Sequence, residues 1–183
     1  SRELDQRFQA AYNAIIKALA GECIRLLTEA DIERNSDLDT WLREHFRHNI
    51  LPSLVPLLID ESQDFPQLMD GELYFAVKMR GDTPRYAILR IPTELGRFVE
   101  LPTGDIMYID DAIRHSLDDV FYIFEYKEIE AFEFKILRDA GLDMDNDFSE
   151  DYVRKMEQEL QSRKGGRPTR LVYDAAIPPV LLR

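Results

Sequence analysis

The chain has 183 residues, of which 45% are hydrophobic and 32% are charged, and its formal net charge at pH 7 is −12. A surface this acidic repels polyanions at long range, which excludes generic nucleic-acid binding but leaves room for a local basic patch. No apolar run is long enough to span a membrane, we expect no signal peptide, and the single cysteine, Cys23, excludes an internal disulfide.

Apolar residues recur at steps of three and four through the first part of the chain. This pattern predicts a long amphipathic helix over residues 3–29. Gly21 is a weak point in this helix, and Cys23 falls inside it as a packed thiol rather than a nucleophile. The polar stretch 31–37 is expected to form a loop, and a second helix is predicted over residues 38–49.

The middle of the chain is rich in aromatic and β-branched residues, which favour strands. We expect extended segments over residues 54–59, 72–80, 85–91, 97–101 and 106–108. Between the second and third of these segments, Gly81 and Pro84 are turn residues. We therefore interpret Arg80-Gly81-Asp82 as the corner of a hairpin rather than as a cell-adhesion motif.

Two helices and two strands are predicted in the last part of the chain. A helix opens at Asp110 or Asp111 and runs to Phe121, and a strand covers residues 128–138. A capping-box pattern at 147–150 opens a helix that ends near residue 163, and the last strand covers 170–173. The whole pattern predicts an α+β fold, in which a long N-terminal helix packs with a mostly antiparallel sheet and further helices.

The expected domain organisation is simple. Residues 1–37 form a helical lead-in to the same domain, and residues 38–179 form the α+β domain itself. Residues 180–183 begin a connection to a C-terminal region that the sequence does not include. We therefore expect an excised piece of a longer protein.

An acidic stretch resembles part of a calcium-binding loop. Asp143, Asp145 and Asp147 match its first, third and fifth positions. However, Phe148 replaces the required glycine and Arg154 replaces the bidentate glutamate. A solvated acidic loop before a helix is the better interpretation.

The three histidines do not assemble a recognisable site in the sequence. His45 and His48 are three residues apart and lack a nearby third metal ligand, which favours surface or capping roles. His115 lies near Asp118 and Asp119, so a small hydrolase with a His–Asp pair is a hypothesis, but no nucleophile accompanies it. We assign no catalytic residue and no metal site.

One segment reverses the acidic character of the chain. Residues 163–170 contain two glycines and the four basic residues Arg163, Lys164, Arg167 and Arg170. These side chains could bind phosphate groups, together with open backbone N–H groups. The alternative is an ordinary helix C-terminus, where basic residues and glycine are common.

Six segments, taken in order, resemble the middle, or head, domain of the multidomain bacterial polyphosphate kinase that works through a phosphohistidine. These segments are HFRHNILPSLVPLLID at 45–60, RYAILRIP at 85–92, RFVELP at 97–102, DDAI at 110–113 with LDDVF at 117–121, LRDAGLD at 137–143, and GRPTRLVY at 166–173. The fifth departs from the family pattern "T-R-(N/D)-A-(D/E)" at Leu137 and Gly141. The resemblance covers about residues 4–179.

The resemblance implies a non-catalytic domain that serves dimer assembly and flanks a polyphosphate channel. The parent enzyme would reversibly transfer the γ-phosphate of ATP to polyphosphate, with Mg and ATP bound by other domains and no cofactor in this chain. The phosphohistidine would lie in the C-terminal domains, so His45, His48 and His115 do not inherit that role. Arg163, Lys164, Arg167 and Arg170 are the channel candidates.

The resemblance also implies the partners. These are the other domains of the same kinase, a second copy in a homodimer or higher oligomer, and polyphosphate through the parent enzyme. We expect a cytoplasmic location, or association with a membrane as part of the parent enzyme. The alternative is a free-standing protein-interaction domain that is unrelated to phosphate transfer.

Overall fold

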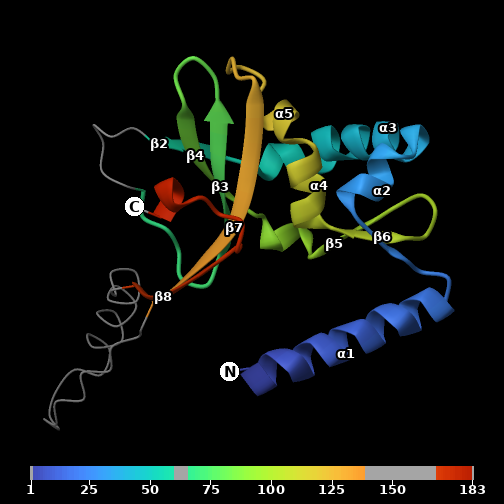
Figure 1. Cartoon of the computed structure of the whole chain (residues 1–183). Helices are drawn as coiled ribbons and strands as arrows, with labels where there is room; N and C mark the ends of the chain where they lie inside the picture. Colours follow the sequence, from blue (N-terminus) through green and yellow to red (C-terminus); the bar gives the residue numbers. More distant parts are fainter. Residues whose placement is uncertain (1, 60–65, 139–167, 183) are drawn as a thin grey trace, which may run out of the picture. The chain divides into compact units, whose positions relative to one another are not determined.

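The structure is a computed structural model that describes residues 2–59, 66–138 and 168–182 (Figure 1). The contacts within the chain divide it into two units, and each unit is made of two separate stretches of sequence. Unit 1 contains residues 1–54 and 92–123, and unit 2 contains residues 55–91 and 124–183. The domain boundaries predicted after residues 37 and 179 stay a prediction.

The first helix of unit 1, α1 (Arg2–Gly21), is shorter than the sequence predicts. It closes with a Schellman motif: the N–H of Ile24 donates to the carbonyl of Leu19 at 2.9 Å, and the N–H of Cys23 donates to that of Ala20 at 3.2 Å. Cys23 occupies the left-handed position of this motif, with a φ of 61°, and is exposed. The predictions that the helix reaches residue 29 and that Cys23 is a packed thiol are therefore wrong.

Residues 31–37 do not form the predicted loop. They belong mostly to two helices, α2 (Glu29–Glu33) and α3 (Ser36–His45). Both helices begin with capping contacts. The Thr28 N–H donates to the Asp31 carboxylate at 2.9 Å, and the Asn35 side chain accepts from two backbone N–H groups of α3. The polar residues of this stretch cap helices instead of linking them.

The second predicted helix is confirmed, but its C-terminal part has a different winding. α3 is followed by a π-helical turn, η1 (Phe46–Ile50), and a 3₁₀ turn, η2 (Leu51–Ser53). The change of winding keeps Leu42, Phe46 and Ile50 all buried in the core of unit 1. Pro52, which has no backbone N–H, lies inside η2, and this turn ends at Ser53.

The predicted helix from Asp110 to Phe121 is split in two. α4 (Ile109–His115) and α5 (Leu117–Val120) are separated at Ser116, whose φ and ψ of −115° and 25° are not helical. Unit 1 also contains a three-stranded sheet in the order β1-β6-β5. Its strands are β1 (Leu26–Leu27), β5 (Phe98–Glu100) and β6 (Ile106–Tyr108), and β1 runs parallel to β6.

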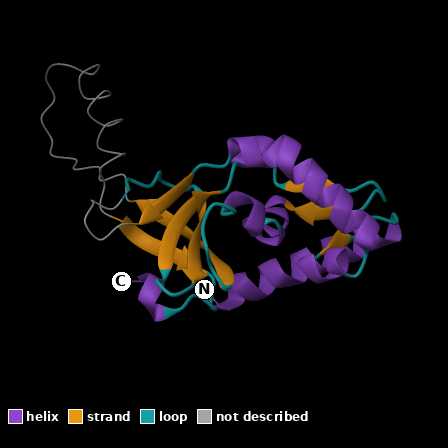
Figure 2. Ribbon diagram, turned by 90° about the horizontal axis from the view of Figure 1, so that it is seen from above, coloured by secondary structure: helices purple, strands orange, loops and turns teal. Residues whose placement is uncertain are grey.

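Unit 2 is built on a five-stranded antiparallel sheet in the order β2-β4-β3-β7-β8, whose strands lie side by side in Figures 1 and 2. The strands are β2 (Pro56–Ile59), β3 (Leu73–Arg80), β4 (Arg85–Arg90), β7 (Glu128–Arg138) and β8 (Pro168–Tyr173). The α+β fold with a mostly antiparallel sheet is thus confirmed. The helix predicted near 147–163 lies outside the described residues.

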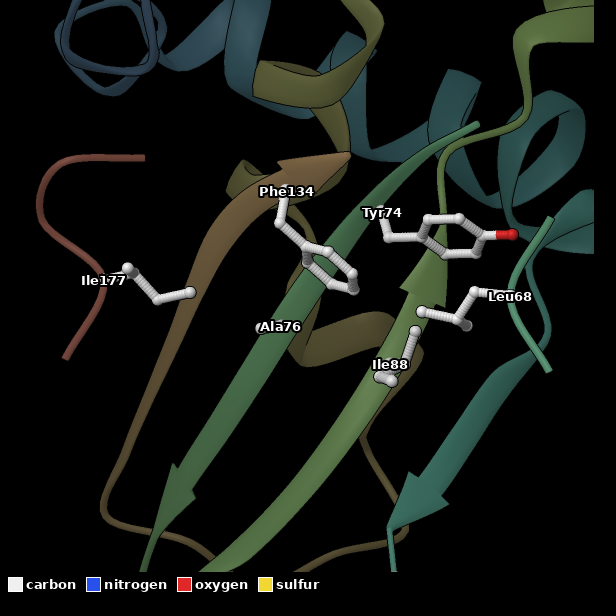
Figure 3. Close-up of a cluster of buried hydrophobic side chains, with 6 residues drawn as sticks. All are labelled: Leu68, Tyr74, Ala76, Ile88, Phe134 and Ile177. Carbon is white, nitrogen blue, oxygen red and sulfur yellow. The ribbon is translucent and has the colours of Figure 1, made fainter. Parts of the chain in front are cut away.

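One face of this sheet carries a compact hydrophobic cluster (Figure 3). The cluster consists of Leu68, Tyr74, Ala76, Ile88, Phe134 and Ile177. Four of its members come from the three central strands, and the rings of Tyr74 and Phe134 stack with centroids 5.6 Å apart. The opposite face of β3 is also buried, because Phe75 and Val77 are 0% exposed. A strand buried on both faces reads as a continuous apolar run, which is why β3 was predictable.

The Arg80-Gly81-Asp82 tripeptide lies at the hairpin between β3 and β4, as predicted. Arg80 binds Glu128 and Glu130 of β7, each at 3.0 Å, and Asp82 lies 3.1 Å from the Lys127 ammonium. The arginine of the tripeptide is therefore held by its own sheet.

Candidate functional site

His115 pairs with a carboxylate that the sequence did not point to. Its Nε2 atom lies 2.6 Å from Oδ1 of Asp39 on α3, and its side chain is only 5% exposed. The predicted neighbours, Asp118 and Asp119, bind Arg43 at 3.2 Å and Arg47 at 2.8 Å instead. His115 therefore links α4 to α3 rather than forming a pair within its own segment.

The surroundings of His115 favour a structural role. The hydrogen bond from His115 and the charge of Arg43 lower the pKa of Asp39 below its ordinary value, although burial opposes them. The adjoining cavity, of about 300 Å³, is lined by Glu29, Glu33, Asp39, Arg43, Arg114 and His115. This lining contains no serine, threonine, cysteine or tyrosine, so it offers the imidazole no nucleophile to activate.

Replacing His115 with alanine should lower the free energy of unfolding by about 1–3 kcal/mol, because a buried hydrogen bond to a charged group is lost. Chemical denaturation followed by circular dichroism measures this change. His48→Ala is the matched control, since His48 is exposed and its Nδ1 lies 2.8 Å from the carbonyl of Glu44, only four residues earlier in the chain. Equal stability of the two variants would contradict the structural role.

A buried carboxylate fixes β1 beside β6. Asp105 is 2% exposed and accepts from Arg25 at three points: from Nη2 at 2.6 Å, from the backbone N–H at 2.9 Å and from Nε at 3.1 Å. The Thr103 hydroxyl donates a further hydrogen bond at 2.8 Å. The side-chain hydrogen bond from Arg25 is the largest of the effects that lower the pKa of Asp105 to about 2. This group is an ionised anchor and not a proton donor.

A cavity of about 470 Å³ in unit 1 lies between α1, β1 and the start of α4. It is lined by Tyr12, Asn13, Ile16, Lys17, Ala20, Leu26, Leu27, Thr28, Tyr108 and Asp111. Burial and a hydrogen bond with Tyr12 raise the pKa of Tyr108 to about 12, and burial raises the pKa of Asp111. A triphosphate would meet one lysine and one aspartate here, so the lining does not suit a phosphate chain.

The histidines of α3 and η1 are engaged locally. The ring of His45 stacks on Trp41 with centroids 4.7 Å apart, and its Nδ1 accepts from the Asn49 amide at 3.3 Å. Burial lowers the pKa of His45, which favours the neutral ring. Among the residues that the structure describes, no group of three histidine, cysteine, aspartate or glutamate side chains is placed to hold a metal. The acidic stretch 143–147 lies outside the described residues.

The basic segment is described only at its end. Arg163, Lys164 and Arg167 lie outside the described residues, whereas Arg170 lies on β8 and is exposed. Arg170 pairs with Leu137 of β7, and Lys135 pairs with Val172 of β8. This register brings Lys135 beside Arg170 on one face of the sheet. The sequence predicts the strand that contains Lys135, but it does not reveal which strand pairs with it.

The described side chains of unit 1 thus form stabilising ion pairs, and the sheet of unit 2 carries an exposed cation at its edge. These features define an α+β domain. Within the described residues, no helix is long and apolar enough to cross a membrane.

Comparison with known proteins places the chain in a family. The model of the polyphosphate kinase middle domain matches residues 37–183. The polyphosphate kinases of Salmonella typhimurium and Escherichia coli are each 33% identical to the chain, over 97% of its length and 27% of theirs. The crystal structure of the polyphosphate kinase from Porphyromonas gingivalis superimposes with a TM-score of 0.71 and 28% identity, over 100% of this chain and 26% of that one.

The chain therefore belongs to the polyphosphate kinase family, and residues 37–183 correspond to its middle domain. It spans about a quarter of the length of these relatives, 27% in the Salmonella enzyme. This confirms the resemblance stated from the sequence.

Proposed function

We propose that the chain is the non-catalytic middle domain of a polyphosphate kinase. The parent enzyme reversibly transfers the γ-phosphate of ATP to inorganic polyphosphate, and this domain serves dimer assembly and flanks the polyphosphate channel. The observation that carries the proposal is the match of residues 37–183 to the middle domain of this family. The match favours this function over a free-standing interaction domain.

Other domains of the parent supply the chemistry in this scheme. The two cavities described above lack a cluster of unengaged cations, because Arg43 and Arg114 already bind carboxylates at 3.0–3.3 Å. In this proposal other domains of the parent bind ATP and Mg, and His115 keeps its bond to Asp39. The location that fits these roles is the cytoplasm, where the parent enzyme is either free or associated with a membrane surface.

The isolated chain should neither make nor consume polyphosphate when it is supplied with ATP and Mg. Phosphate release and ATP formation from polyphosphate and ADP measure both directions. The parent enzyme, assayed in parallel, is the positive control. Sustained turnover by the isolated chain would overturn its non-catalytic role.

Reversing two cations of the basic segment should weaken the use of polyphosphate. In the parent enzyme, the double variant Arg167→Glu and Arg170→Glu should raise the KM for polyphosphate about tenfold or more, since a charge-assisted contact contributes about 1.5–3 kcal/mol. Steady-state kinetics with polyphosphate and ADP measure this change. The KM for ADP serves as the internal reference.

The matched control for this variant changes the net charge by the same amount elsewhere. The control is the double variant Arg7→Glu and Lys17→Glu, which replaces two exposed cations of α1. This control should leave the KM for polyphosphate within about twofold, because salt screens a change of net charge that makes no direct contact with the polymer, with a Debye length of about 8–10 Å. An equal rise in both double variants would show a general charge effect and not a channel contact.

A further inference from the structure

The pairing of β7 with β8 creates a feature that neither segment reveals alone. Lys135 lies opposite Val172, and Arg170 lies opposite Leu137. Lys135 and Arg170 are therefore diagonal neighbours on the same face of an antiparallel pair. Such neighbours are roughly 7–8 Å apart, which long side chains can span.

These two cations differ from Arg80 and Lys127, which also lie in unit 2. Arg80 binds Glu128 and Glu130, and Lys127 binds Asp82. By contrast, Lys135 and Arg170 have no ion pair, hydrogen bond or ring contact within the part of the chain that the structure describes. Their charges are available to an external anion.

The charges along this face have a definite order. Two residues before Lys135 on β7 comes Glu133, and its carbonyl accepts from the N–H of Asp174 at 2.8 Å. Glu133 and Asp174 therefore form the next rung on this face, because the alternation of a strand places Glu133 on the face of Lys135. The two carboxylates of that rung repel an anion, whereas Arg170 attracts it.

Apolar side chains lie next to Arg170 on this face. Leu137 is half-buried beside Arg170, and Val172, opposite Lys135, is 43% exposed. A guanidinium binds two phosphate oxygens in a planar fork, and an ammonium adds a compact point charge. A pair of this kind suits neighbouring phosphate groups of one polyanion.

We propose that Lys135 and Arg170 form a two-cation contact for the phosphate groups of polyphosphate on the β7–β8 face. This inference rests on the proposed function and adds to it Lys135, which lies outside the basic segment. The contact acts on the binding of the polymer and takes no part in the transfer of the phosphoryl group.

The experiment compares single neutral replacements in the parent enzyme that contains this chain. Lys135→Gln and Arg170→Gln should each raise the KM for polyphosphate about three- to tenfold, and the KM for ADP should stay constant. The salt dependence of the KM should also weaken, because fewer counterions are displaced when a polyanion binds one cation fewer. Orthophosphate at the same phosphate concentration tests whether the pair binds a single phosphate group as well as the polymer.

Lys78→Gln is the matched control. Lys78 lies on β3 of the same sheet, opposite Glu130, and the alternation of the strands places it on the other face. It is half-buried like Lys135 and forms no ion pair within the residues that the structure describes. This variant should keep the KM for polyphosphate of the wild type, and thermal unfolding should confirm that all three variants fold.

The outcomes separate the two proposals. If Lys135→Gln and Arg170→Gln behave like Lys78→Gln while charge removal at Arg163, Lys164 and Arg167 raises the KM, the two-cation contact is overturned and the proposed function stands. If the parent enzyme does not use polyphosphate at all, the proposed function itself fails. If orthophosphate at the same phosphate concentration competes with polyphosphate for the pair as well as the polymer binds it, the polymer is overturned as the ligand.

Discussion

Truncation of Phe134 to alanine should lower the free energy of unfolding by about 3–5 kcal/mol, the usual range for a phenylalanine removed from a core. Phe134 is 8% exposed and lies at the centre of the cluster in Figure 3. Its ring stacks on Tyr74 at 5.6 Å, so the truncation removes an aromatic contact and leaves a cavity beside Ala76 and Ile88.

Urea denaturation followed by circular dichroism measures this loss. The matched control is Leu58→Ala on β2, where the side chain is 50% exposed and its truncation should change the free energy by about 0.5 kcal/mol or less. A loss below about 1 kcal/mol for Phe134→Ala would show that the cluster is not the core of unit 2.

The second large effect is expected at Asp105. Asp105→Asn keeps the shape of the side chain but removes the charge that Arg25 contacts at 2.6 Å, and the free energy of unfolding at pH 7 should fall by about 2 kcal/mol. The estimate is at the lower end of the range for charged partners, because the Arg25 side chain is 66% exposed and solvent screens the pair.

The same pair predicts a dependence on pH. The folded pKa of Asp105 is about 2 and its ordinary value is 3.8, so the folded state favours the ionised form. The contribution of a depressed carboxyl pKa is complete above the unfolded value and is lost as the pH falls through the folded value. The difference between wild type and Asp105→Asn should therefore be constant above about pH 5 and shrink between about pH 4 and pH 2.

The control for this prediction is Asp82→Asn. Asp82 lies 3.1 Å from the Lys127 ammonium, but its side chain is 96% exposed, and exposed pairs contribute about 0–1 kcal/mol. A difference that grows as the pH falls from 5 to 2 would contradict the assignment of Asp105 as an ionised anchor.

The strands were predictable because their local signal is strong. β3, β4 and β7 combine apolar runs or alternation with flanking turn residues, and the predicted ranges match the observed ones to within one residue. The helix ends were less predictable. A left-handed cysteine closes α1, whereas such positions are usually occupied by glycine, so Gly21, the last residue of α1, was only a weak signal of this end.

The candidate site was less predictable than the fold, since long-range pairing determines it. His115 and Asp39 are 76 positions apart, and only the packing of α4 on α3 brings them together. Lys135 became a candidate for the same reason, since only the pairing of β7 with β8 places it beside Arg170. The spacing of residues in one segment identifies neighbours within a helix or strand, but it does not identify partners across elements.

The division of each unit into two separate stretches has a consequence for biosynthesis. The ribosome releases residues 1–54, and then the first stretch of unit 2, before residues 92–123 emerge to complete unit 1. Each half-built unit therefore exposes apolar surface while it waits for its distant complement. Because such non-local closures slow folding, this stretch of the nascent chain should be a preferred client for chaperones that act during translation.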